Sequence, residues 1–208
     1  LPLFNLLNGA TDYSKIDFQS MDNILSYLKK EGPVEPNITG GLSNTFRYKN
    51  WELSCLITVA AGNKIRKPDQ YSVDYNDLSV FPKEMRNRWI NPGDERVTNI
   101  PAIADKRTVN EVGRSTLRRV YNAYNYSTER VVDGSFVRMK SIGLSYTFPK
   151  DVLDALHVNN FTLRLQATNP FLIYADKNLN GQDPEFFRTG GVAYPVNTQY
   201  TFTINLGI

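Results

Sequence analysis

Apolar and polar residues alternate along several stretches of the chain, and the alternation is cleanest near the C-terminus. In residues 200–208 every second side chain is apolar, and the residues between them are threonine, asparagine and glycine. The same period of two runs through residues 161–168, 142–148 and 51–61, and a shorter run covers residues 42–48. Because successive side chains of a β-strand point to opposite faces, this pattern predicts five strands with one apolar face each.

The connections between these strands alternate between short and long. Residues 49–50 and 149–159 form short links, whereas residues 62–133 and 175–197 form long ones. Outer-membrane β-barrels have short periplasmic turns and longer extracellular loops. The pattern therefore predicts a transmembrane barrel wall, with the short links in the periplasm and the long connections outside the cell.

A soluble β-sandwich with one polar face is the alternative interpretation of the same alternation. Two features favour the barrel. The polar faces are small and rich in hydroxyl groups, which suits a lumen, and aromatic residues lie near the strand ends, as in interfacial girdles. These aromatic residues are Tyr48, Trp51, Tyr146, Phe148, Phe171, Tyr174 and Tyr200.

The number of strands sets the expected domain organisation. Five strands cannot close a barrel, since about eight is the smallest number seen. We therefore expect an all-β chain that supplies the C-terminal strands of a large antiparallel transmembrane barrel. Residues 41–208 would form these strands, and residues 1–40 an extracellular loop segment with a short helix over residues 21–30.

Composition excludes several other classes of protein. The 24 Lys and Arg residues nearly balance the 21 Asp and Glu residues, whereas nucleic-acid-binding domains show a strong basic excess. One cysteine, Cys55, and one histidine, His157, exclude a disulfide framework and a multi-histidine metal centre. No nucleophile motif accompanies His157, and no basic neighbour in sequence activates Cys55. We predict no enzyme activity, no catalytic residue and no bound cofactor.

A series of short motifs gives the chain a family resemblance. In order they are GGLSNTFRYKNWELS (residues 40–54), GNKI (62–65), RWINPGD (88–94), DGSFVRMKSIGLSYTFP (133–149), NPF (169–171) and GQDPE (181–185). The ordered series resembles the barrel of SusC/RagA-type TonB-dependent outer-membrane transporters over residues 36–208. Such a transporter carries its plug domain and the rest of its barrel in an N-terminal part that this chain does not contain.

The resemblance implies a function and a set of partners. It implies import of glycan oligomers or oligopeptides across the bacterial outer membrane, powered through TonB and capped by a SusD-like surface lipoprotein. Outer-membrane lipid and the remainder of the same barrel are the other expected partners. Two alternatives stay open, namely a passive porin or structural barrel, and a soluble β-rich carbohydrate-binding module.

Aromatic residues in the first long connection are candidates for facing the substrate. They are Tyr71, Tyr75, Trp89, Tyr121, Tyr124 and Tyr126. Aromatic faces beside hydrogen-bonding side chains suit glycan stacking or peptide capture. The same composition also suits loops that pack on each other, and for any single residue packing is the favoured interpretation.

The second long connection contains part of a calcium-binding pattern. Its oxygen donors are Asp176, Asn178, Asn180 and Asp183, with Gly181 at the turn. The glutamate that completes such a loop is replaced by Phe187. A turn-rich loop without a metal is therefore the favoured interpretation, and a bound Ca²⁺ ion is the alternative.

Overall fold

The computed structural model describes residues 25, 27–75, 78, 80–189 and 195–208. The chain divides into two compact units. We call the described part of residues 33–65 and 133–208 the sheet unit, and the described part of residues 1–32 and 66–132 the loop unit. Most of the expected helix over residues 21–30, and of the segment 1–40 that contains it, lies outside the described residues.

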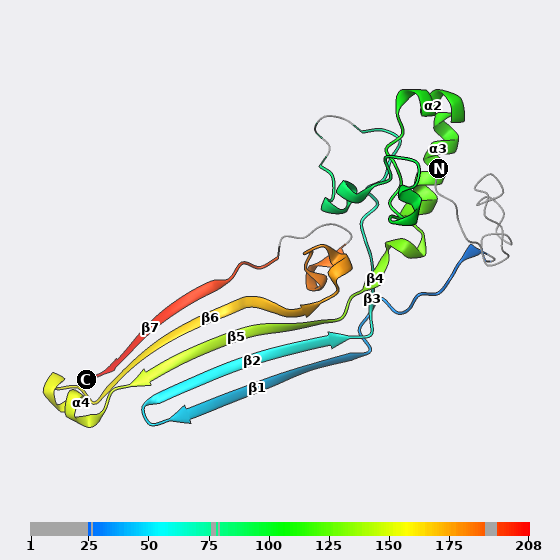
Figure 1. The fold of residues 1–208 in the computed structure, drawn as a ribbon. Coiled ribbons are helices and arrows are strands. Elements are labelled where there is room, and N and C mark those ends of the chain that lie inside the picture. The colour runs from blue at the N-terminus through cyan, green and yellow to red at the C-terminus, as the bar shows by residue number, and fades with distance from the viewer. Residues whose placement is uncertain (1–24, 26, 76–77, 79, 190–194) are drawn as a thin grey trace. The chain divides into compact units, whose positions relative to one another are not determined.

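Five long strands make up the sheet unit (Figure 1). They are β1 (Ile38–Tyr48), β2 (Trp51–Ala61), β5 (Phe136–Thr147), β6 (Asn160–Ala175) and β7 (Gln199–Gly207). Their order in the sheet is β1-β2-β5-β6-β7, and all neighbours are antiparallel. The strands contain 9 to 16 residues, and a tilted strand needs about 9–11 residues to cross a bilayer. The predicted all-β sheet of five strands is confirmed.

The two short links lie at the same end of the sheet. Lys49 and Asn50 turn the chain between β1 and β2, and the Asn50 side chain donates a 2.7 Å hydrogen bond to the carbonyl of Thr147 at the end of β5. The link from β5 to β6 contains α4 (Lys150–Leu156), which ends at His157 in the left-handed conformation. Because the strands are antiparallel, both long connections leave from the opposite end.

The strand register joins the apolar positions into continuous rows. One row crosses all five strands through Phe46, Leu53, Leu144, Leu165 and Phe202. An adjacent row on the same face contains Tyr48, Trp51, Tyr146, Leu163 and Ile204. The residues between these positions lie on the opposite face of the sheet. They form polar rows there, such as the row of Arg47, Glu52, Ser145, Arg164 and Thr203. The sheet therefore has one apolar face and one polar face, as the alternation predicts.

Bulges extend the strands beyond the limits that the alternation suggests. On β5 the pairing with β2 jumps from Ser141 to Met139, so Lys140 is an extra residue. Opposite it on β6, Asn169 takes a left-handed φ of 51° and Pro170, which has no N–H to donate, follows. The extra residue inverts the alternation on β5, which is why the periodic run starts only at residue 142 although the strand begins at Phe136. β1, which pairs with β2 in one unbroken register, begins at Ile38, before the expected boundary at residue 41.

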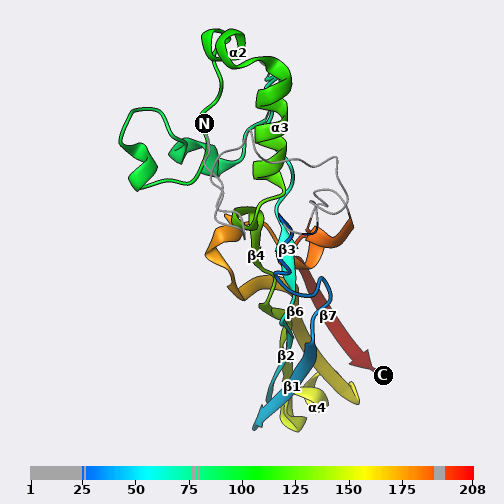
Figure 2. The same ribbon diagram turned by 90° about the vertical axis from the view of Figure 1, so that its right-hand side faces the viewer.

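The connection expected over residues 62–133 contains a folded unit. After the short strand β3 (Lys64–Arg66) come η2 (Lys83–Asn87), η3 (Asp94–Arg96), α2 (Lys106–Val112), α3 (Arg114–Asn125), η4 (Thr128–Arg130) and the short strand β4 (Val131–Asp133). Asp105 caps α2 by accepting a 2.7 Å hydrogen bond from the Thr108 N–H. α2 leads into α3, the long helix of this unit (Figure 2). No helix within the described residues combines the length and the apolar character needed to cross a membrane.

A small core holds the loop unit together. α3 buries Leu117, Tyr121 and Tyr124, which are spaced by four and then three residues and therefore share one helix face. Tyr71, Val73 and Met85, from the segment before the helices, pack against this face. The long connection is thus a folded unit with its own core.

Candidate functional site

Three of the six aromatic candidates for substrate contact lie inside the loop unit's core. Tyr71, Tyr121 and Tyr124 are all buried. The rings of Tyr71 and Tyr124 meet edge to face with centroids 4.9 Å apart, and the Tyr121 hydroxyl donates a 2.6 Å hydrogen bond to the carbonyl of Ala102. Their burial favours the packing interpretation for these three residues, and substrate contact stays a prediction of the sequence.

Burial also holds these tyrosines in their protonated form. It raises the pKa of Tyr121 and of Tyr124 from 10.0 to about 12. The pKa of Tyr71 is raised as well, by burial first and then by the nearby Glu84 carboxylate. The protonated hydroxyls of Tyr71 and Tyr121 donate hydrogen bonds, to Glu84 and to the carbonyl of Ala102.

A buried ionic network lies next to the Tyr71 ring and is centred on Glu84. The Glu84 carboxylate accepts hydrogen bonds from Arg130, from Lys67 at 2.7 Å and from the Tyr71 hydroxyl at 3.1 Å. Burial alone would raise the pKa of Glu84, but the hydrogen bonds from Lys67 and Arg130 outweigh it and hold the pKa below its ordinary value. The Arg130 guanidinium also lies 4.9 Å from the centre of the Tyr71 ring. The network joins Lys67, near the start of residues 66–132, to Arg130 near their end, which is a structural role.

The other three aromatic candidates differ in their exposure. Tyr75 is half-buried, and its hydroxyl accepts a 2.9 Å hydrogen bond from the Ser72 N–H. Trp89 is half-buried and its ring N–H donates to Glu95 at 3.0 Å. Tyr126 is 59% exposed, with the Arg66 guanidinium 5.6 Å from its ring centre. Of the six candidates, Tyr126 is thus the one that the loop unit leaves largely open.

The residues of the calcium-loop hypothesis are engaged in other interactions. Asp176 accepts hydrogen bonds from the backbone N–H of Asn178 at 2.9 Å and of Asp133 at 3.1 Å. Asn180 takes a left-handed φ of 54°, and Asp183 pairs with Arg138. Within the described residues no three carboxylate, imidazole or thiolate side chains are grouped to hold a metal ion. Calcium binding stays a prediction of the sequence.

The isolated histidine and cysteine take unremarkable positions. His157 is exposed at the C-terminal end of α4, with a left-handed φ of 56°. Cys55 is a free, half-buried thiol on β2, opposite Ile142 on the apolar face.

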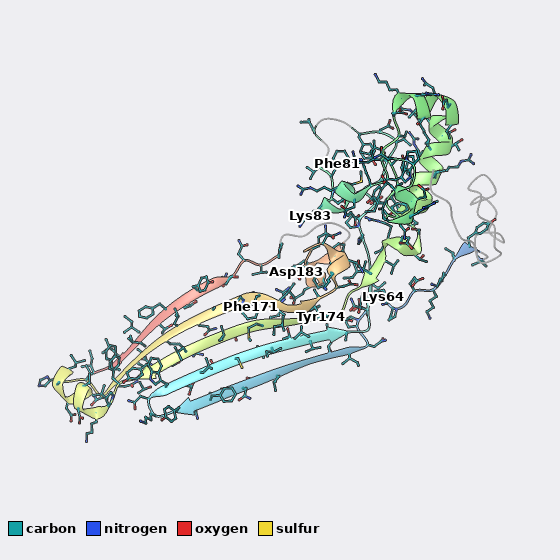
Figure 3. All side chains as sticks on the ribbon, in the orientation of Figure 1. Lys64, Phe81, Lys83, Phe171, Tyr174 and Asp183 are labelled. Carbon is teal, nitrogen blue, oxygen red and sulfur yellow. The ribbon has the colours of Figure 1, made fainter. Side chains whose placement is uncertain are left out.

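An ion-pair cluster on the sheet unit was missed by the sequence reasoning. Arg138 of β5 pairs with Asp183 and, at 2.8 Å, with Glu185, both from the segment that follows β6. Lys140 donates to Glu185 at 2.7 Å. The matched spacing of two basic and two acidic residues, each pair separated by one residue, is the signal in the sequence that could have revealed it. Figure 3 labels Asp183 in this segment.

Aromatic rings line one end of the apolar face, next to the short links. Trp51 and Tyr146 have ring centroids 4.6 Å apart, Tyr146 and Phe148 5.0 Å, and Phe148 and Phe161 4.3 Å. Tyr48 lies directly opposite Trp51 in the register. Four of the seven aromatic residues that the sequence places near strand ends, Tyr48, Trp51, Tyr146 and Phe148, therefore form a row with Phe161 at this end of the apolar face.

Comparison with known proteins gives matches to part of much longer chains. No protein-family model matches the sequence. A TonB-dependent receptor of Formosa agariphila is 26% identical over an alignment of 182 residues, which covers 82% of this chain and 16% of the receptor. A second TonB-dependent receptor of the same organism is 28% identical over an alignment of 165 residues, which covers 77% of this chain and 15% of the receptor. The chain thus spans about a sixth of the length of these curated relatives.

Solved structures match the fold of the whole chain. The RagAB peptide importer in its open-open state aligns with a TM-score of 0.62 and 21% identity, over 100% of this chain and 20% of the importer chain. Its closed-closed state aligns with a TM-score of 0.61 over 97% of this chain. The resemblance to SusC/RagA-type TonB-dependent transporters is confirmed: the chain has the fold of a portion of the RagA β-barrel, and its sequence is similar to TonB-dependent receptors.

Proposed function

We propose that this chain forms part of the barrel wall of an outer-membrane importer for nutrient oligomers. One observation carries the proposal. The sheet presents a continuous apolar face, bordered by an aromatic row, and a polar face on its other side. A water-soluble sheet would cover such a face with a second layer, whereas a membrane barrel turns it to lipid.

The dimensions of the apolar face suit a bilayer. On β6 the apolar positions run from Phe161 to Phe171, which is about 33 Å along a strand at ~3.3 Å per residue. At the tilt of about 40° that is usual in barrels, this length covers about 25 Å of membrane height. The Trp51–Phe161 aromatic row then lies at one interface, where amphipathic rings are favoured.

The polar face lines the lumen in this proposal, and the edges of the sheet pair with the rest of the barrel. β1 and β7 each have one neighbour within the described residues. An unpaired backbone N–H or C=O that faces hydrocarbon costs several kcal/mol. Further strands of the same barrel therefore complete the pairing of both edges.

Transport function, partners and substrate follow from the relatives by analogy. The curated relatives bear the name of TonB-dependent receptors, and the solved RagAB complex is a peptide importer. For the protein that contains this chain we infer import powered through TonB, a SusD-like lipoprotein lid, and oligopeptides or glycan oligomers as cargo. The outer membrane is its location, with the short links in the periplasm and the long connections outside the cell.

Cysteine labelling of whole cells tests the topology. In a Cys55→Ala background of the full-length protein, Asn91→Cys in the loop unit is expected to react with a membrane-impermeant maleimide. Asn50→Cys and Asp154→Cys, at the end of the sheet with the short links, are expected to react only after the outer membrane is opened. Labelling of Asn50→Cys but not Asn91→Cys in intact cells would invert the topology.

Uptake measurements separate an active importer from a passive pore. Cells with and without the full-length gene are supplied with fluorescent oligopeptides and glycan oligomers of graded length. Accumulation that needs both the gene and TonB supports the proposal and identifies the cargo class. Accumulation that needs the gene but persists without TonB indicates a porin.

A further inference from the structure

The segment that follows β6 is tied to the rest of the sheet unit at several points. Asp176 at its start accepts a hydrogen bond from the backbone N–H of Asp133. Leu179, in the single turn η5 (Lys177–Leu179), is only 1% exposed. Asp183 and Glu185, at the start of η6 (Pro184–Thr189), pair with Arg138 and Lys140. Residues 176–187 therefore form one docked segment, which we call the strap.

The register shows on which face of the sheet the strap lies. Arg138 pairs with Thr58, while its neighbours Val137 and Met139 pair with Val59 and Ile57. Val59 and Ile57 share the face of Cys55 and Leu53, which is the apolar one, so Arg138 points to the polar face. The guanidinium is 5% exposed and bound by two carboxylates of the strap. The strap consequently covers the polar face at the end of the sheet from which the long connections leave.

The bulge at Lys140 makes this arrangement possible. If β5 paired regularly through Lys140, position 138 would keep the phase of Ile142 and Leu144 and would project from the apolar face. The inversion puts a charged residue on the polar face within reach of Asp183. The left-handed Asn169 and Pro170 bend β6 at the same level of the sheet.

We propose that the strap folds into the mouth of the barrel and that Arg138 is the positioning residue that latches it there. This inference rests on the proposed function, because the polar face is a lumen wall only in a barrel. The latched strap is a fixed inward layer beside β5 and β6, and it narrows the extracellular entrance on that side. Arg138 and Lys140 are neutralised by Asp183 and Glu185, so the layer adds bulk without adding net charge to the entrance.

The test measures access to Leu179, which only a docked strap protects. The full-length protein carries Cys55→Ala and Leu179→Cys, and maleimide labelling is followed in isolated outer membranes. Arg138→Met removes both ion pairs of the arginine and is expected to raise the labelling rate about tenfold or more, because Asp183 loses its cation and Glu185 keeps only Lys140. Arg138→Lys keeps the charge but not the fork geometry, so an intermediate rate is expected.

Matched variants separate unlatching from general damage to the barrel. Arg164→Met removes an arginine from the same polar face, where the described residues offer it no ion pair, and is expected to leave labelling of Leu179→Cys unchanged. Asp183→Asn combined with Glu185→Gln removes the latch from the strap side without changing a strand, and it is expected to match Arg138→Met. Lys177→Cys, which is exposed in the docked strap, is expected to label equally in all variants.

The outcomes distinguish the strap from the proposed function. If the protein is in the outer membrane but Leu179→Cys is labelled at the same rate with Arg138 and with Arg138→Met, the proposal that the strap is latched to the sheet is wrong. If Arg138→Met and Arg164→Met raise the labelling rate of Leu179→Cys equally, Arg138 has no specific role in holding the strap. Absence of the full-length protein from the outer membrane overturns the proposed function itself, and this is read from fractionation before any labelling.

Discussion

The two units of this chain treat the same kinds of residue in opposite ways. In the loop unit Tyr71 is 3% exposed and packs in a core with other tyrosines, whereas Tyr200 of the sheet unit is 77% exposed. Phe46 and Phe202, at the two edges of the central apolar row, are also more than half exposed. Charged groups do not separate the two units in this way, since Arg130 of the loop unit and Arg138 of the sheet unit are both buried in ion pairs.

The difference indicates two different surroundings. The loop unit buries aromatic side chains and satisfies its buried ions internally, as a domain folded in water does. The sheet unit leaves an apolar face uncovered across five strands, far beyond the isolated apolar side chains that a soluble surface tolerates. The loop unit is therefore stabilised by its own core, whereas the sheet unit needs an apolar environment outside the chain.

Removing the buried arginine is the largest expected perturbation of the loop unit. Arg130→Met leaves the buried Glu84 carboxylate with one cation fewer, and the loss of one partner of a buried pair costs about 3–5 kcal/mol. Hydrogen exchange of the full-length protein should show faster exchange in α3 and unchanged exchange in β5 and β6. Arg107→Met, which breaks an exposed pair with Glu111, is the control and should cost at most about 0.5 kcal/mol.

The same leucine truncation should have different effects in the two units. Leu117 is fully buried in α3, so Leu117→Ala should destabilise the loop unit by about 2–5 kcal/mol. Leu165 is 54% exposed on the apolar face, where in the proposed barrel lipid would fill the space that alanine leaves, so Leu165→Ala should cost less than about 1.5 kcal/mol. Denaturant unfolding in detergent compares the two, and equal losses would mean that the sheet face is packed against protein.

Arginine scanning of β6 and β7 tests the two faces of the sheet. Leu165→Arg places a charge on the apolar face and should destabilise the barrel by about 2–4 kcal/mol near the middle of the membrane. Thr203→Arg lies on the polar face opposite Arg164 and should be tolerated. The fraction of folded protein in outer membranes is the measurement, and equal damage from both variants would contradict the assignment of the faces.

The stability of the loop unit should fall toward both extremes of pH. Glu84 has a pKa below its ordinary value of 4.5 in the folded protein, so its contribution is present above that value and is lost as pH falls through the lowered pKa. Tyr121 and Tyr124 have a pKa of about 12, against 10.0 in the unfolded chain, so stability falls as pH rises from 10 to 12. The ultraviolet absorbance of the phenolates reports the ionisation that causes the loss of stability at alkaline pH. Tyr121→Phe should make this loss smaller.

Several features were predictable because they depend on residues close together in sequence. The period of two predicted the five strands and their faces, and the pairing of Leu163 with Ile204 and of Arg164 with Thr203 confirms which positions share a face. The short links were predictable from Pro149 and from the tight turn at Lys49. The motifs predicted the family resemblance, although they cannot show how their residues meet in space.

Other features depend on contacts between residues far apart in the sequence, and only the tertiary structure shows them. Whether Tyr71 and Tyr124 line a ligand site or a core depends on contacts between segments more than fifty residues apart, and a tyrosine has the same local pattern in either case. The bulge at Lys140 depends on the partner strands, because an extra residue is visible only when the register is known. The pairing of Arg138 with Asp183 needs both that bulge and the return of the chain after β6. Local alternation therefore determined the sheet and its two faces, whereas the core of the loop unit and the docked strap were decided by contacts that no local pattern encodes.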